Sequence, residues 1–167
     1  MKPNQKGFSL IELLIVVAII LIIAAIAIPN LMRSRMAANE SSAVGSVRTI
    51  ITAEVTYDST FPDTGYSLDL TSLGGTTAAC VPGQVAQTTA ACLIDQTLSV
   101  TQQKSGYTFG AAGAPVGGST TNNTYTVTAV PLGVGSTGNR GFYSDQSGVI
   151  RYTLDGTAPT TASSPLQ

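Results

Sequence analysis

The hydrophobic residues of this chain are concentrated in one block near its start. Residues 8–32 are almost wholly apolar and contain a single charge, Glu12, and residues 13–28 contain only Leu, Ile, Val and Ala. A membrane-spanning helix needs about 20 apolar residues, whereas the apolar part of a secretory signal has roughly 7–15. The block therefore predicts a helix that is buried on every side, either in lipid or in other protein.

The residues on either side of the block indicate its direction and a bend. Lys2 and Lys6 lie in a polar leader of residues 1–7, and a basic flank stays on the cytoplasmic side of a membrane. The rest of the chain is then expected outside the cytoplasm. Pro29 lacks a backbone donor and clashes with the preceding helical turn, so we expect a kink there.

Residues 33–60 change to an amphipathic pattern and predict that the helix continues. The helix is expected to end near Tyr57, because Pro62 disfavours helical backbone at the residue before it. Glu54 and Asp58 fall on the apolar side, where we expect hydrogen bonds near the edge of a sheet. At about 100° per residue, the apolar face comprises Ala43, Val44, Val47, Ile50, Ile51 and Val55.

Residues 61–167 are rich in Gly, Thr and Ser and predict a loop-rich β domain. The candidate strands are residues 107–109, 125–130, 141–144 and 149–154. Residues 145–148 are typical of a turn between the last two strands. Residues 110–124 are expected to be a loop and residues 157–167 a flexible tail. The predicted fold class is α+β, with a long N-terminal helix on an antiparallel sheet of about four strands.

The amino-acid composition argues against several classes of function. Only 10% of the residues are charged and the formal net charge is -1, which is too little basic charge for a nucleic-acid surface. The sequence has no histidine, the residue that most often serves as general base and metal ligand. We therefore expect neither an enzyme nor a cofactor or metal site.

Three smaller motifs have simple structural interpretations. Cys80 and Cys92 are the two cysteines, and outside the cytoplasm such a pair is most simply a disulfide. Asp145 and Asp155 could contribute to a calcium site, but aspartates at turns are more often turn formers. The glycines at 133, 135 and 138 fit a dinucleotide-binding spacing, but a strand and not a helix is predicted after them.

The segment Lys6-Gly-Phe-Ser-Leu-Ile-Glu-Leu13 resembles the processing signature of the type IV pilin family, which includes the pseudopilins of type II secretion. The resemblance covers about the first 40 residues. It implies that a prepilin peptidase cleaves after Gly7, that Phe8 becomes an N-methylated N-terminus, and that Glu12 guides assembly. It also places Pro29 where the helix of this family bends or unwinds in the filament.

Glu12 is informative without the resemblance. A carboxylate in an apolar span costs about 2.5–3.5 kcal/mol on insertion scales, and the span contains no cationic side chain. After cleavage, the nearest cation would be the α-amine of Phe8, either in the same chain or in a neighbouring one. The alternative is a Glu that the helix dipole tolerates near the helix N-terminus.

The expected function is that of a structural subunit of a type IV pilus, used for adhesion, motility or DNA uptake. The chain would be an inner-membrane precursor that later forms a cell-surface helical homopolymer. Its partners would be the prepilin peptidase, an assembly platform with its ATPases, and an outer-membrane secretin. Two alternatives remain: a type II secretion pseudopilin, and a soluble secreted binding domain cut after Ala27, because residues 25–27 resemble a signal-peptidase site.

Overall fold

The computed structural model describes residues 7–76 and 78–166 of the chain. Lys2, Lys6 and the rest of the predicted leader before Gly7 lie outside the described residues. The chain forms two compact units, Met1–Arg35 (unit 1) and Met36–Gln167 (unit 2). Helix α1 (Leu10–Thr60) contributes to both units, and it ends three residues beyond the predicted Tyr57.

Unit 1 consists, over its described residues, of the first part of α1 and the short segment before it. Its large apolar side chains are exposed, with 46–84% of their surface accessible in the monomer. The helix passes through Pro29 without interruption. Residues 7–35, the described part of unit 1, therefore have no hydrophobic core of their own.

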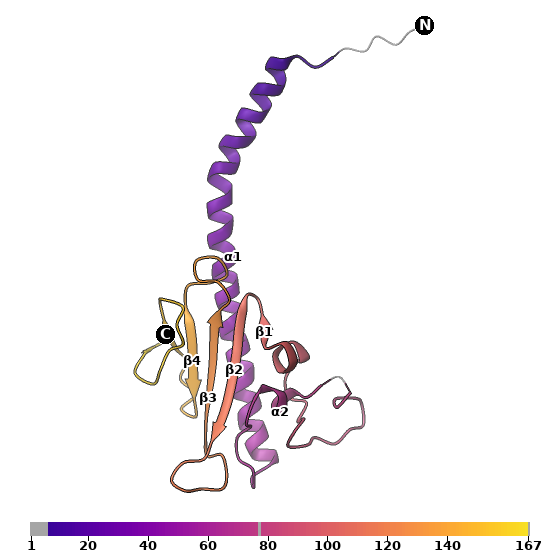
Figure 1. Cartoon of the computed structure of the whole chain (residues 1–167), viewed down its shortest axis with the longest axis vertical. Coiled ribbons are helices and arrows are strands. Elements are labelled where there is room, and N and C mark those ends of the chain that lie inside the picture. Colours follow the sequence, from indigo (N-terminus) through magenta and orange to yellow (C-terminus); the bar gives the residue numbers. More distant parts are fainter. Residues whose placement is uncertain (1–6, 77, 167) are drawn as a thin grey trace. The chain divides into compact units, whose positions relative to one another are not determined.

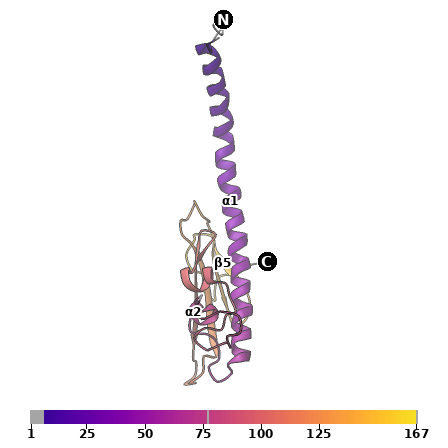
Figure 2. The same cartoon turned by 90° about the vertical axis from the view of Figure 1, so that its right-hand side faces the viewer.

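Unit 2 packs the second part of α1 on one face of an antiparallel sheet (Figures 1 and 2). The spatial order of the strands equals their order in the chain, and each strand pairs with the next. The strands are β1 (Gln103–Lys104), β2 (Tyr107–Ala114), β3 (Thr124–Pro131), β4 (Gly141–Asp145), β5 (Arg151–Thr153) and β6 (Ser164–Pro165). This arrangement confirms the predicted α+β class.

The sheet has six strands, so the expected number of about four was wrong. The predicted loop at 110–124 begins as strand, because β2 stays in register with β3 from Tyr107↔Pro131 to Ala114↔Thr124. The predicted flexible tail contains β6, which pairs with β5 through Arg151↔Pro165 and Tyr152↔Ser164. Leu166 then donates its N–H to the carbonyl of Ile150 at 2.7 Å.

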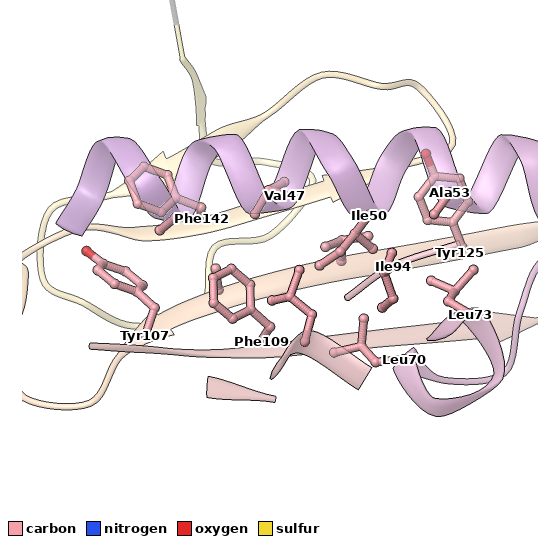
Figure 3. Packing of buried hydrophobic residues seen from close by; sticks show 14 of the residues in the cluster. Val47, Ile50, Ala53, Leu70, Leu73, Ile94, Tyr107, Phe109, Tyr125 and Phe142 are labelled. Carbon is pink, nitrogen blue, oxygen red and sulfur yellow. The ribbon is translucent and has the colours of Figure 1, made fainter. Parts of the chain in front are cut away.

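The core of unit 2 lies between α1 and the sheet (Figure 3). The predicted apolar face was right for its centre and wrong for Val55, which is 52% exposed. Ala53 and Tyr57 occupy the buried stripe instead, because the stripe follows the i, i+3, i+4 spacing that starts at Ala43. The α1 residues of the core are Ala43, Val47, Ile50, Ala53 and Tyr57, and they meet Leu70, Leu73, Leu98, Tyr107, Phe109, Tyr125, Val127 and Phe142.

Two short helical segments close one side of the core. Helix α2 (Leu70–Gly74) begins after Asp69, whose carboxylate accepts from the backbone N–H of Ser72 at 2.7 Å. The π-helical turn η1 (Thr97–Thr101) packs beside α2, and Ser99 donates its hydroxyl to the carbonyl of Gly75. Neither segment was predicted from the sequence, because each has only five residues.

Glu54 is fully buried and ties α1 to the segment that follows it. Its carboxylate accepts from the backbone N–H of Ser67 at 2.9 Å and from the Ser67 hydroxyl at 2.7 Å. The hydrogen bonds expected for Glu54 therefore exist, but they come from this connecting segment and not from a sheet edge. The side chain of Asp58 accepts none from the described residues, so the expectation was wrong for Asp58. Burial raises the pKa of Glu54, and the two bonds from Ser67 partly oppose that rise. Nearby, burial raises the pKa of Tyr125 to about 12.

Removing a buried and an exposed side chain from α1 should have different effects. Ile50→Ala leaves a cavity in the core and should lower the free energy of unfolding by about 2–5 kcal/mol. Val55→Ala, five residues later on the exposed side, should change it by less than about 0.5 kcal/mol. Chemical denaturation of the full chain in detergent measures both values. Equal losses would contradict the observed helix face.

The buried carboxyl of Glu54 should leave a pH signature. Its pKa is raised in the folded state, so the folded chain holds this proton more tightly than the unfolded chain does. The difference in unfolding free energy between wild type and Glu54→Gln should therefore fall as the pH rises above the ordinary carboxyl value of 4.5 and through the raised pKa. Denaturation curves at intervals between about pH 4 and 8 test this. A constant difference between wild type and Glu54→Gln would show that burial does not perturb Glu54.

Candidate functional site

The predicted processing site lies just before the first turn of α1. Gly7 and Phe8 are exposed and precede the helix, and Phe8 is 84% exposed. An added Cβ on Gly7 would meet no atom within 4 Å, so the backbone around the 7–8 peptide bond is open. A protease could therefore reach this bond without unwinding the helix.

Glu12 lies in the first turn of α1 and turns back to the helix N-terminus. Its Oε2 accepts from the backbone N–H of Ser9 at 2.9 Å. This contact is one half of a capping box, in which a Glu at the third helical position satisfies the N–H of the capping residue. This role of Ser9 was not predicted, although Ser-x-x-Glu before an apolar run is the signal for it.

The candidate functional site has two parts. The first comprises Gly7, Phe8 and Glu12, and the second is the apolar block that follows Glu12. Its helix is long and apolar enough to cross a membrane, and none of its most apolar stretch is buried. Length and composition alone support this assignment. The apolar surface of this helix needs to be covered by lipid or by protein. The described part of unit 1 does not cover it. The predicted kink at Pro29 stays a prediction.

The two cysteines are joined to each other, as the sequence predicted. The Cys80–Cys92 bond closes a loop in unit 2. Tyr57 of α1 donates its hydroxyl to the carbonyl of Thr88 at 2.6 Å, so the loop is also fastened to the helix. Cys92 has a positive φ of 59°, a conformation that few residues other than glycine adopt.

The aspartates considered for calcium act as turn formers. Asp145 accepts from the backbone N–H of Ser147 at 2.9 Å. Asp155 accepts from the N–H and the hydroxyl of Thr157, and these bonds lower its pKa. Among the described residues, no group of three or more His, Cys, Asp or Glu side chains could hold a metal ion.

The glycine-rich segment at 133–138 forms a turn and not a phosphate-binding loop. The N–H groups of Ser136 and Thr137 both donate to the carbonyl of Gly133. The segment leads into β4, so no helix N-terminus follows it.

The N-terminal segment of the chain is similar to a known protein family. The family described as the prokaryotic N-terminal methylation motif matches residues 2–28. This match covers Gly7, Phe8 and Glu12 but does not test their individual roles.

Three relatives match a part of the chain. The type IV major pilin protein PilA of Myxococcus xanthus is 46% identical over 56 residues, which are 34% of this chain and 26% of that protein. The type IV wide pilus major component PilA4 of Thermus thermophilus is 63% identical over 38 residues, 23% of this chain and 29% of that protein.

The third relative is the type IV major fimbrial protein FimA of Dichelobacter nodosus. It is 54% identical over 54 residues, 30% of this chain and 35% of that protein. The chain thus spans about a third or less of the length of these relatives. No solved structure matches the chain significantly.

The disulfide should contribute measurably to the stability of unit 2. Replacing both cysteines by serine frees a loop of about 13 residues in the unfolded chain and should lower the free energy of unfolding by about 3 kcal/mol. Chemical denaturation of wild type and the double variant gives the difference. Reductant should destabilise wild type by a similar amount and leave the double variant unchanged. Equal stability of both proteins would show that the bond adds nothing.

Proposed function

We propose that the chain is a structural subunit of a type IV pilus. The observation that supports this most strongly is the exposed apolar helix of unit 1, whose start lies within an N-terminal methylation motif. An ordinary secretory protein discards its apolar segment, whereas this arrangement keeps it. The relatives that match a part of the chain are named major pilins or pilus components, which favours the pilus over the pseudopilus.

The first proposed step is processing. The leader of residues 1–7 is removed after Gly7 by a prepilin peptidase, and the new N-terminus, Phe8, is N-methylated. The exposure of Gly7 and Phe8 supports access to this bond. Until cleavage, residues 8–32 hold the precursor in the inner membrane, with residues 33–60 and the β domain of 61–167 on the far side from the leader.

The second proposed step is assembly. Cleavage creates an α-amine on Phe8, with a reference pKa of about 8, one helical turn from the carboxylate of Glu12. In the precursor this carboxylate is satisfied by the N–H of Ser9. Pairing Glu12 with the Phe8 amine of a neighbouring subunit would fix the register between helices, because an unpaired charge in an apolar core is costly.

Repetition of one heterologous contact then builds a filament. Identical apolar helices cover each other as they leave the membrane, and a contact that does not close on itself produces a helical fibre. The proposed partners are the same chain, the prepilin peptidase, an assembly platform with ATPases and an outer-membrane secretin. We propose a structural role and no catalytic one, in keeping with the pilins named above.

The mature N-terminus provides the direct test. Filaments sheared from the cell surface should contain a chain that starts at N-methylated Phe8, because the peptidase site precedes the retained helix. Intact mass and N-terminal sequencing measure this. A Gly7→Leu variant should keep the precursor mass and yield no filaments, since the added side chain changes the residue at the cleaved bond.

Other N-termini would support other functions. A chain that starts at Ile28 would be an ordinary secreted protein cut after Ala27, and the filament proposal would fail. Correct processing with only short, cell-envelope filaments would indicate a pseudopilin.

A further inference from the structure

Several turns of unit 2 lie together at one end of its sheet. β2 begins and β3 ends at this end, and β4 begins and β5 ends there too, because neighbouring strands are antiparallel. Residues 105–106 and 132–140 connect strands at this end, and residues 154–157 follow β5 there. Figure 1 shows the arrow of β3 pointing toward it. We call it the helix-entry end, because it lies beside the start of α1 within unit 2.

The start of α1 within unit 2 holds the turn of residues 132–140 in place. The side-chain amide of Asn39 donates to the carbonyl of Thr137 at 2.9 Å. Glu40 accepts from the backbone N–H of Asn139 at 2.8 Å and pairs with Arg140 at 3.1 Å. These bonds fix the turn beside the helix.

Apolar side chains project from the helix-entry end. Leu132 and Val134 are 54% and 58% exposed, and Leu154 is 73% exposed. The segment after Leu154 lies against the turn, since a Cβ added to Gly156 would be 2.5 Å from a methyl carbon of Val134. We call Leu132, Val134 and Leu154 the apolar tip. Exposed apolar side chains that gather in one place mark an interaction surface.

The apolar block of the same chain indicates what the tip contacts. Asn39 follows Met32, the last residue of the block, by seven positions. Seven residues span about 10 Å as helix, which α1 is, and at most about 25 Å when extended. A membrane that holds residues 8–32 therefore stays close to the helix-entry end.

The charges between the block and Asn39 fit a lipid surface. Arg33 and Arg35 are exposed, and neither has a carboxylate within 4 Å among residues 7–76 and 78–166. Guanidinium groups suit the phosphates of lipid headgroups. Asp155 is acidic and lies next to Leu154, but its carboxylate already accepts the N–H and the hydroxyl of Thr157.

We propose that in the membrane-held precursor the apolar tip docks into the surface of the bilayer that contains residues 8–32. Its aliphatic side chains leave water at the boundary between headgroups and acyl chains. Unit 2 is then held to the membrane by a second contact besides the helix. This inference rests on the proposed function, and it adds the lipid surface as a partner of the β domain before assembly.

The opposite end of the sheet supplies a matched control position. Val116, in the connection between β2 and β3, is 55% exposed, close to the 58% of Val134. β2 and β3 have eight residues each, so the two ends of the sheet are about 27 Å apart.

Tryptophan quenching by brominated lipids tests the contact. The chain contains no tryptophan, so Val134→Trp introduces a single reporter. The full-length precursor is placed in liposomes of phosphatidylethanolamine and phosphatidylglycerol with brominated acyl chains, which quench tryptophan on close approach. Val134→Trp should be quenched at least about twice as strongly as Val116→Trp. Equal quenching of both variants, or none of Val134→Trp, would overturn the proposal.

A second pair of variants tests the native side chain, because tryptophan itself favours membrane interfaces. With Leu154→Trp as the reporter, Val134→Asp should lower the quenching at least about twofold, since a carboxylate opposes entry into lipid. Val116→Asp should leave the quenching unchanged. Chemical denaturation in detergent checks that both variants remain folded, as expected for exposed positions. The same quenching in both variants would refute the apolar tip.

Flotation of the liposomes separates this inference from the proposed function. A wild-type chain that does not insert would refute the membrane-held precursor and with it the docked tip. Insertion without quenching of Val134→Trp would refute the tip alone and leave the pilin proposal intact. A tip that is shielded only in assembled filaments would also refute the lipid contact, because neighbouring subunits would then be its cover.

Discussion

The structure depends on one constraint: the apolar surface of residues 8–32 has no cover within unit 1. Unit 2 uses its own apolar side chains, such as Ile50, Tyr107 and Phe142, to fill its core. A monomer in water would expose this surface, which the hydrophobic effect disfavours. The lipid and the neighbouring subunits of the proposed pilus would each supply the apolar surroundings that this part of α1 needs.

A single helix serves two different surroundings because its pattern changes along its length. Its first part is apolar all round, which suits lipid or a bundle of helices. From Ala43 onward only one stripe is apolar, and that stripe lies on the sheet. Glu54 occupies this buried stripe and is satisfied by Ser67, so the polar link fixes where the chain turns away from α1. Tyr57 adds a second link, to the disulfide loop.

The sequence predicted best what depends on local pattern. The length of the apolar block, the prepilin motif and the centres of four strands could be recognised, and so could the cysteine pair. The extension of β2 through Gly110–Ala114 could not, because small residues have weak strand preference and are held there by pairing with β3. Strand β6 depends in the same way on β5, a partner about a dozen residues away. Val55 was misplaced because a helical wheel shows which residues share a face but not where the sheet ends.

The C-terminal segment has a practical consequence for labelled or displayed versions of the protein. Leu166 donates its backbone N–H to the carbonyl of Ile150 and lines two neighbouring hollows beside α1. A peptide fused after Leu166 would therefore emerge next to this helix. The turn between β2 and β3 is a better place for an added peptide than the C-terminal segment. Gly117 and Gly118 are exposed there and have no neighbouring atoms within 4 Å of an added Cβ. Epitopes for surface display therefore belong in the β2–β3 turn, where an inserted loop leaves both the sheet and the helix untouched.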